Sequence, residues 1–303
     1  MFIVRNRKFF YTLSILLVVM SLTALFIWGL RPGIDFKGGS LVEVEYPIGS
    51  RPSTETIKAN LDALNLGEYS VRETGESGLL IRTSELSPKM HEAVLIELSD
   101  KGIRAEEKRF NSIGPVLGDE ALQKSWISVI MVLVAIVLFI TFAFRKVSEP
   151  VSSFKYALIA IIALVHDVII PAGVFAVLGH FAGFEIDTLF VTALLVILGF
   201  SIHDTIVVFD RVRENLRRNR EDKQKKSFDV IVGESINQTF VRSVNTSLTT
   251  LIAVFVLYLV GAEATRHFSL TLLIGIFVGT YSSIFLGSPL LVTVYKWQEK
   301  RNK

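Results

Sequence analysis

The stretch from Gly199 to Asn215 reads GFSIHDTIVVFDRVREN, and it decides the fold of this chain. It ends an apolar run that begins near Thr188 and is long enough to cross a bilayer. Yet His203 and Asp204 lie inside this stretch, before the span ends. A charged side chain within a span is expensive unless it faces the interior of a helix bundle, a partner or water. Asp204 is therefore a candidate functional residue in a helical membrane bundle.

Other apolar runs accompany this one. Half of the 303 residues are hydrophobic, and the mean hydropathy is +0.49. Average globular proteins are only slightly less apolar, so the clustering into long uncharged runs decides the class. A span needs about 20 apolar residues, and six spans fit. We predict spans at residues 12–30, 124–144, 155–179, 187–210, 243–262 and 267–295.

Basic residues alternate between the two ends of these spans. Lysine and arginine are frequent in residues 1–11, 211–242 and 296–303, whereas the connections after the third and fifth spans hold one arginine, Arg266. Because basic residues favour the cytosolic side of a membrane, we expect both termini and a basic 211–242 connection in the cytosol. Residues 31–123 then lie outside it. The isoelectric point of about 9.0 thus reflects membrane topology and does not indicate nucleic-acid binding.

The first apolar run follows a basic flank, as the core of a signal peptide does. It is longer than an ordinary signal-peptide core, and Leu30-Arg31-Pro32-Gly33 offers no small-residue cleavage site. We therefore expect a retained membrane anchor.

Motifs of several enzyme classes are absent from the sequence. The chain has no cysteine, which excludes disulfides and cysteine metal sites. It contains no P-loop, Rossmann glycine motif, HExxH or GxSxG, and no histidine cluster with zinc spacing. We expect neither an ATPase nor a hydrolase, no catalytic residues, and no bound cofactor or metal.

Residues 31–123 have the alternating pattern of a small α+β domain. Ser53 and Ser87 precede apolar residues at helical spacing and are predicted helix starts. The predicted strands are residues 40–46, 69–74, 79–83 and 103–110, with helices over 53–64 and 87–98. This β-α-β-β-α-β order is the ferredoxin-like motif. The predicted fold class is a polytopic α-helical membrane protein with a small ferredoxin-like α+β domain outside the cytosol.

The third span also contains a polar pair, His166 and Asp167, near its middle. Pro171 follows and is expected to bend the helix. The pair is either held by polar groups of neighbouring helices or part of a proton relay, because histidine titrates near neutral pH. The residues alone leave both interpretations open.

In the fifth span Arg242 shares a helical face with Thr246 and Thr249. Arg242 either snorkels to the cytosolic interface as an anchor, or it pairs with Asp204 and is released when that carboxylate takes a proton. In the sixth span, small residues recur every four positions, which lets another helix approach closely. These residues are Gly275, Gly279, Ser283 and Gly287.

Several of these elements resemble the SecF proteins of the SecD/SecF family, which belongs to the RND superfamily. The 199–215 stretch is similar to the family's fourth-span motif, residues 236–251 to its fifth-span element, and residues 273–285 to its sixth. Gly114-Pro115 and Gly118, just before the second span, are similar as well. These elements occur in the family's order over nearly the whole chain.

The resemblance implies an RND-like bundle that works with SecD and the SecYEG channel, with YajC and YidC as further candidate partners. Such a subunit uses the proton motive force to promote late steps in the export of unfolded polypeptides. Its expected place is the bacterial cytoplasmic (inner) membrane.

The resemblance also implies roles for single residues. Asp204 and Arg242 match the family's proton-site pair, with His203, Asp167 and His166 as further relay candidates. Many relatives have asparagine where this chain has His203, so His203 either retunes Asp204 or joins the relay. This departure leaves open whether the coupling ion is a proton or sodium.

A second set of residues has a coupling or structural role in the family pattern. The element GIDFKGG, residues 33–39, is by itself a tight connection in which glycine supplies positive φ. In SecF-like chains it joins the first span to the outer domain, so it is also a candidate coupling joint. The full set is Gly33, Asp35, Gly38, Gly39, Asp210, Thr246, Thr249, Gly275 and Gly279.

Two other functions compete with this one. A half-size RND-type exporter of small molecules or lipids, acting as a dimer, would need a porter domain larger than residues 31–123. A passive scaffold of the translocon would need no ion flux, and measuring proton conductance distinguishes it from a motor.

Overall fold

The structure is a computed structural model that describes residues 2–99, 103–144, 151–223 and 226–301. The chain divides into two compact units. We call residues 1–31 with 127–303 the membrane unit, and residues 32–126 the sheet unit.

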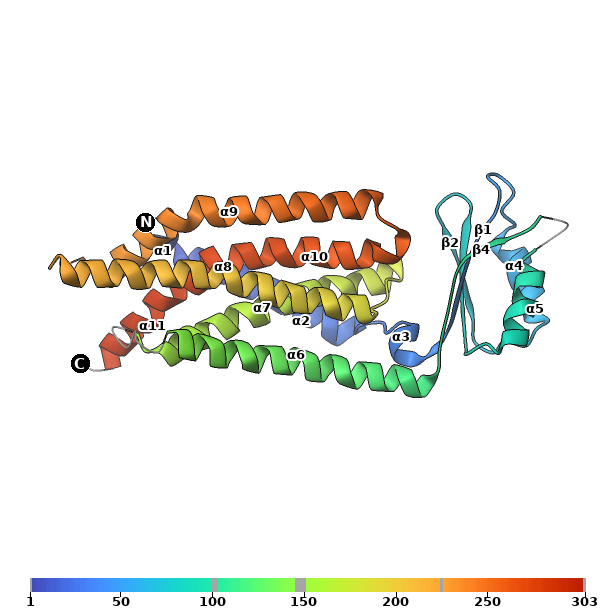
Figure 1. The fold of residues 1–303 in the computed structure, drawn as a ribbon, viewed down its shortest axis with the longest axis horizontal. Coiled ribbons are helices and arrows are strands. Elements are labelled where there is room, and N and C mark those ends of the chain that lie inside the picture. Colours follow the sequence, from blue (N-terminus) through green and yellow to red (C-terminus); the bar gives the residue numbers. More distant parts are fainter. Residues whose placement is uncertain (1, 100–102, 145–150, 224–225, 302–303) are drawn as a thin grey trace. The chain divides into compact units, whose positions relative to one another are not determined.

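Long helices make up the membrane unit. They are α1 (Phe2–Arg5), α2 (Arg7–Trp28), α6 (Pro115–Ala143), α7 (Ser153–Ala182), α8 (Thr188–Glu221), α9 (Phe228–Val260), α10 (Glu263–Ser282), a π-helical turn η1 (Ser283–Gly287), and α11 (Ser288–Arg301) (Figure 1). Among the described residues, six helices are long and apolar enough to cross a membrane: α2, α6, α7, α8, α9 and the run from Thr265 to Arg301. The predicted six-span membrane fold is confirmed.

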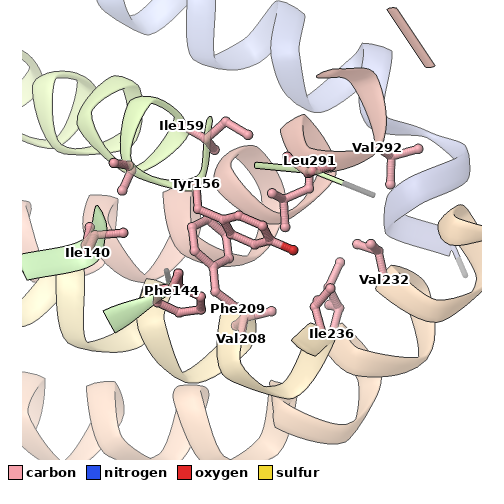
Figure 2. Packing of buried hydrophobic residues seen from close by; sticks show 14 of the residues in the cluster. Ile140, Phe144, Tyr156, Ile159, Val208, Phe209, Val232, Ile236, Leu291 and Val292 are labelled. Atoms are coloured by element: carbon pink, nitrogen blue, oxygen red, sulfur yellow. The ribbon is translucent and has the colours of Figure 1, made fainter. Parts of the chain in front are cut away.

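Aromatic rings form the centre of the largest core in the membrane unit. The rings of Phe144 and Tyr156 stack with centroids 5.4 Å apart, and Phe209 meets Tyr156 edge-on at 5.1 Å (Figure 2). Each such pair adds about 0.5–1.5 kcal/mol beyond the burial of its area. Buried aliphatic side chains from α9 and α11 complete this cluster: Val232, Ile236, Leu291 and Val292.

The predicted basic connection over residues 211–242 is mostly helical in the structure. α8 continues to Glu221, and α9 already begins at Phe228. Phe228 and Val232, which lie within this connection, are buried in the core. Charge pairs at helical spacing stabilise the extended α8. These pairs are Arg211–Glu214 at 2.5 Å, Arg218–Glu214 at 2.6 Å and Arg217–Glu221 at 2.7 Å.

The π-helical turn η1 has a cause in the sequence. Pro289 has no backbone N–H, and its ring would clash with the carbonyl one turn earlier in a regular α-helix. That carbonyl belongs to Phe285, inside the turn, where the Ser288 hydroxyl also donates to the Ser283 carbonyl at 2.7 Å. The wider turn therefore carries the last span past Pro289 without breaking it.

The sheet unit contains six regular elements in the predicted order, after a short helix α3 (Ile34–Lys37). Ser53 and Ser87 cap its two helices, as the sequence predicts. The strands lie in the order β2-β3-β1-β4, and all neighbours are antiparallel. The elements are β1 (Gly39–Glu45), α4 (Thr54–Asp62), β2 (Ser70–Thr74), β3 (Gly78–Thr83), α5 (Pro88–Leu98) and β4 (Glu106–Ile113).

The last strand begins three residues later than the predicted 103–110. Ile103 and Ala105 pack against the core of the sheet unit without pairing in the sheet, so their apolar character is real but their strand assignment was wrong. Pairing with β1 runs instead to Ile113, which lies opposite Gly39.

Gly38 and Gly39 need glycine for both backbone conformation and space. Their φ angles are +75° and +120°, as expected for a tight connection. A Cβ on Gly38 would lie 2.7 Å from the Cα of Pro115, and one on Gly39 would lie 2.6 Å from the carbonyl oxygen of Thr83. Gly33, by contrast, has an ordinary φ of −79°.

We expect Gly39→Ala to destabilise the sheet unit more than Gly49→Ala does. Gly49 also has positive φ, but nothing lies within 4 Å of its Cβ position. Backbone strain alone costs about 1 kcal/mol at either site, and only Gly39→Ala adds a clash with backbone. Tryptic cleavage of residues 32–126 after equilibration in urea measures both variants. Equal losses of stability would contradict the steric account.

Candidate functional site

Asp204 is buried in the middle of the membrane unit and bound to hydroxyl groups. Its side chain is only 2 % exposed on α8. Its Oδ2 accepts a hydrogen bond from Ser247 Oγ of α9 at 3.2 Å. Ser247 Oγ in turn accepts from Thr280 Oγ1 of α10 at 2.7 Å. A line of polar groups therefore runs from α8 through α9 to α10.

Asp167 of α7 is the second buried carboxyl, and its side chain is fully enclosed. Its Oδ2 accepts from Ser201 Oγ of α8 and from Ser282 Oγ of α10, the latter at 2.8 Å. Its Oδ1 lies 2.9 Å from His166 Nδ1. Three helices thus meet at this carboxyl, and both of its oxygens have partners.

His166 leaves one ring nitrogen without a partner. When Nδ1 donates to Asp167, Nε2 carries a free lone pair. Nε2 is buried and has no hydrogen bond within the described chain. The ring lies roughly parallel to Tyr281, with centroids 6.2 Å apart. The His166–Asp167 pair, which we call the dyad, can therefore hold one more proton at Nε2 or between the two groups.

His203 lies beside Asp204 but differs from it in exposure. Its side chain is 61 % exposed, and its Nδ1 is 3.8 Å from Asp204 Oδ1. That distance is too long for a hydrogen bond, so a protonated His203 acts on Asp204 only through space. The two side chains therefore lie side by side, with His203 at the surface and Asp204 inside the bundle.

The ion pair expected between Arg242 and Asp204 is not formed. Arg242 is exposed on α9, and its charge acts on Asp204 without contact. The buried face of α9 instead presents Ser243 and Ser247. Thr246 and Thr249, which share the face of Arg242, are also exposed. The hydroxyl of Ser247 therefore contacts Asp204, where one of the two interpretations of Arg242 placed its guanidinium.

The small residues of the last span allow the close approach on which the site depends. A Cβ on Gly275 would lie 2.1 Å from Ile197 Cδ1, which means that α10 packs tightly on α8. A Cβ on Gly279 would lie 3.0 Å from Ser201 Cβ and 3.6 Å from Asp167 Oδ2. Gly275 and Gly279 thus lie where α10 comes closest to its neighbours.

Other candidates lie outside this network. Asp210 is 66 % exposed and pairs with Arg213 at 3.5 Å. Gly33, Asp35, Gly38 and Gly39 belong to the sheet unit.

Four hydroxyl residues of the site were missed from sequence: Ser201, Ser247, Thr280 and Ser282. One signal was present, because Ser243 and Ser247 are four residues apart, beside the face of Arg242. Ser201 lies three residues before Asp204 and so shares its side of α8. For Thr280 and Ser282 the sequence offers no comparable signal, since both resemble ordinary small residues of a packed span.

Two family models match this chain. Residues 94–297 match the family model described as "Protein export membrane protein SecD/SecF, C-terminal", and residues 23–46 match "SecD/SecF GG Motif". The chain belongs to the SecD/SecF family. The resemblance noted in the sequence is thereby confirmed.

Full-length relatives support the same family. The "Protein translocase subunit SecF" of Thermobaculum terrenum is 43% identical, with 98% of this chain and 94% of the relative covered. That of Anaerolinea thermophila is 36% identical, with 99% and 96% covered.

A solved structure agrees as well. The crystal structure of SecDF from Thermus thermophilus, titled a translocon-associated membrane protein, has a TM-score of 0.82 and 30% identity. The match covers 98% of this chain and 38% of that longer chain.

Removing the Asp167 carboxylate should destabilise the membrane unit. Asp167→Ala leaves the donors of His166, Ser201 and Ser282 without their acceptor, and a buried polar group without a partner costs about 1–3 kcal/mol. We expect a loss of that size, against less than about 0.5 kcal/mol for Asp210→Ala at the surface. Equilibrium unfolding in mixed micelles, followed by tryptophan fluorescence, compares the two. Equal stability of the two variants would contradict the network.

Proposed function

We propose that this chain is an auxiliary subunit of a protein-export translocase and that it uses the proton motive force to promote late steps of polypeptide export. It acts with a SecD-type partner. Membership in the SecD/SecF family supports the export role. The observation that carries the proton role is Asp204, buried in a spanning helix and bound to hydroxyls, with no contact to a lysine or arginine among the described residues.

Proton movement supplies enough energy to shift helices. A unit charge crossing 100 mV releases about 2.3 kcal/mol, and each unit of pH difference adds about 1.36 kcal/mol. An ionised Asp204 accepts the hydrogen bond of Ser247, whereas a protonated Asp204 donates one. Each proton that enters and leaves therefore changes the bonds between α8 and α9.

His203 and the dyad complete the proposed relay. His203 is exposed next to Asp204, so it is placed to pass a proton to or from the buried carboxyl. The dyad lies on the α7 side of α8, where Ser201 contacts it. A sodium ion in place of the proton would bind the same carboxyl and hydroxyl oxygens around Asp204. Measuring proton flux at a fixed sodium concentration distinguishes the two coupling ions.

The outer surface of α9 supports a partner in the membrane. Arg242, Asn245, Thr246 and Thr249 are exposed along a helix that spans the bilayer, and His203 is exposed on α8. Polar and charged groups are costly against lipid. We therefore place a spanning segment of the SecD-type partner on this polar surface, where it supplies hydrogen-bond partners and a counter-charge for Arg242.

Motion of the first two spans would reach the sheet unit through one packed joint. In that unit a Cβ on Gly118 would lie 2.8 Å from the backbone nitrogen of Gly38 and 3.0 Å from the backbone carbonyl of Phe36. The entry and exit segments of the sheet unit therefore move together. We propose that this joint transmits movement to the unit that holds the emerging polypeptide.

The proposal also includes the membrane, the partners and the substrate of the subunit. The subunit lies in the bacterial cytoplasmic membrane with both termini in the cytosol, and the SecYEG channel is its main assembly, with YajC and YidC as further partners. Its substrate is an unfolded exported polypeptide. It is no enzyme and binds no cofactor, because the ion gradient supplies the energy.

Asp204→Asn tests the proton role. The amide keeps the shape and the bond to Ser247 but carries no titratable proton. Export into membrane vesicles should lose its dependence on the proton motive force, while copurification with the partner stays intact. Asp210→Asn is the matched control and should leave export unchanged. Unchanged export by Asp204→Asn would remove this carboxyl from the mechanism.

A photoreactive residue at position 245 tests the partner surface. In native membranes, Asn245 replaced by a photoreactive amino acid should crosslink to another membrane protein chain. Val134, 52% exposed on the apolar helix α6, is the control and should give mainly lipid adducts. Lipid adducts alone at position 245 would contradict a covered surface.

A further inference from the structure

α10 contacts both buried carboxyl sites through two hydroxyl groups. Thr280 Oγ1 lies 2.7 Å from Ser247 Oγ, which bonds Asp204. Ser282 Oγ lies 2.8 Å from Asp167 Oδ2. Residues two positions apart on a helix point to different sides. One helix, packed beside α7, α8 and α9 (Figure 1), therefore reaches Asp204 through Ser247 on one side and contacts the dyad directly on another.

Each of these hydroxyls has one proton and two acceptors within reach. Thr280 Oγ1 lies 2.7 Å from Ser247 Oγ and 2.8 Å from the Ile276 carbonyl. Ser282 Oγ lies 2.8 Å from Asp167 and 3.1 Å from the Gly279 carbonyl. Because a hydroxyl donates only one hydrogen bond at a time, each donates either to the carboxyl network or to a backbone carbonyl of α10.

The charge of Asp204 decides that choice on one side of α10. An ionised Asp204 accepts a hydrogen bond from Ser247, whose oxygen in turn accepts one from Thr280. A protonated Asp204 is itself a donor toward Ser247. Ser247 then turns to the Ser243 carbonyl, 2.9 Å away. Asp204 and Thr280 then share the two lone pairs of the Ser247 oxygen. In this state Thr280 bonds an oxygen that already accepts from Asp204, and the Ile276 carbonyl is its alternative acceptor.

The same choice exists at the dyad. Ser282 donates to an ionised Asp167, and it turns to the Gly279 carbonyl when Asp167 no longer needs a donor. Directly after Ser282 the helix becomes the π-helical turn, where Ser283 Oγ lies 2.9 Å from Thr205 Oγ1. Turns of this kind occur frequently at functional sites. Both choices thus act on the same short piece of α10.

Within the part of the chain that the structure describes, the charged or titratable groups beside these sites are His203 on α8 and Arg242 on α9 near Asp204, and His166 on α7 with Tyr281 on α10 near Asp167. The Ser14 hydroxyl of α2 donates to Tyr281.

We propose that Thr280 and Ser282 are positioning residues that couple the protonation of Asp204 to the dyad through α10. The inference rests on the proposed function in one respect, that Asp204 gains and loses a proton. It adds a path by which that event reaches a second buried carboxyl on another helix. Coupled groups titrate as a pair, so a change at one displaces the midpoint of the other.

Infrared difference spectroscopy on the complex in lipid measures this coupling. The carboxyl bands of Asp204 and Asp167 are assigned from Asp204→Asn and Asp167→Asn. We expect Asp204→Asn to displace the titration midpoint of the Asp167 band by about 1 pH unit, the size of a strong coupling. Thr280→Val should remove at least half of that displacement, and so should Ser282→Ala. Thr280→Ser, which keeps the hydroxyl, should preserve it.

Two matched controls lie on the same helix. Thr271 and Ser269 are fully buried, and their hydroxyls donate to carbonyls of α10 itself, those of His267 and Thr265, each at 2.8 Å. Thr271→Val and Ser269→Ala should leave the displacement unchanged. An equal displacement in Thr280→Val and Thr271→Val overturns the coupling path.

The spectra also separate this inference from the proposed function. If the Asp204 band titrates but Asp204→Asn leaves the Asp167 midpoint in place, the coupling is wrong and the proposed function stands. If the Asp204 band never changes with pH, the proposed function fails, and the coupling fails with it.

Discussion

A carboxyl group buried among hydroxyls inside a membrane bundle constrains the rest of this structure. Neither lipid nor a packed core can solvate a charge, so every helix around Asp204 and Asp167 must bring a donor. Ser201, Ser247 and Ser282 do so from three different helices. Their short side chains require close packing, which Gly279 permits because it has no Cβ to separate α10 from α8. The same small residues therefore allow the helices to pack closely and supply hydrogen-bond donors to the buried carboxyls.

The arrangement separates two tasks along the last span. Its first half, α10, carries one hydroxyl that contacts Asp167 and one that reaches Asp204 through Ser247, and its second half, α11, packs into the aromatic core with Leu291 and Val292. The π-helical turn before Pro289 lies between them. A change in hydrogen bonding at the carboxyls thus acts on the end of α10, directly before the π-helical turn. The polar surface of α9 lies outside this network, and we propose that a partner contacts it.

The sequence could predict the features that depend on local pattern. Apolar run length located the spans, Ser53 and Ser87 marked helix starts, and the glycines at 38 and 39 marked a tight connection. Which helical faces meet is not local information. Arg242 and Ser243 are adjacent in sequence but lie on different sides of α9, and only tertiary packing turns Ser243 and Ser247 inward. The charged end of α8 extends beyond the predicted span, and ion pairs at helical spacing keep it helical.

Proton flux under an imposed voltage tests the central claim most directly. The chain and its partner are placed in liposomes that enclose a pH-sensitive dye, at fixed sodium concentration. The account predicts voltage-driven acidification of the interior that disappears in Asp204→Asn and persists in Asp210→Asn. Wild-type flux no greater than that of empty liposomes would contradict it and would leave a passive scaffold.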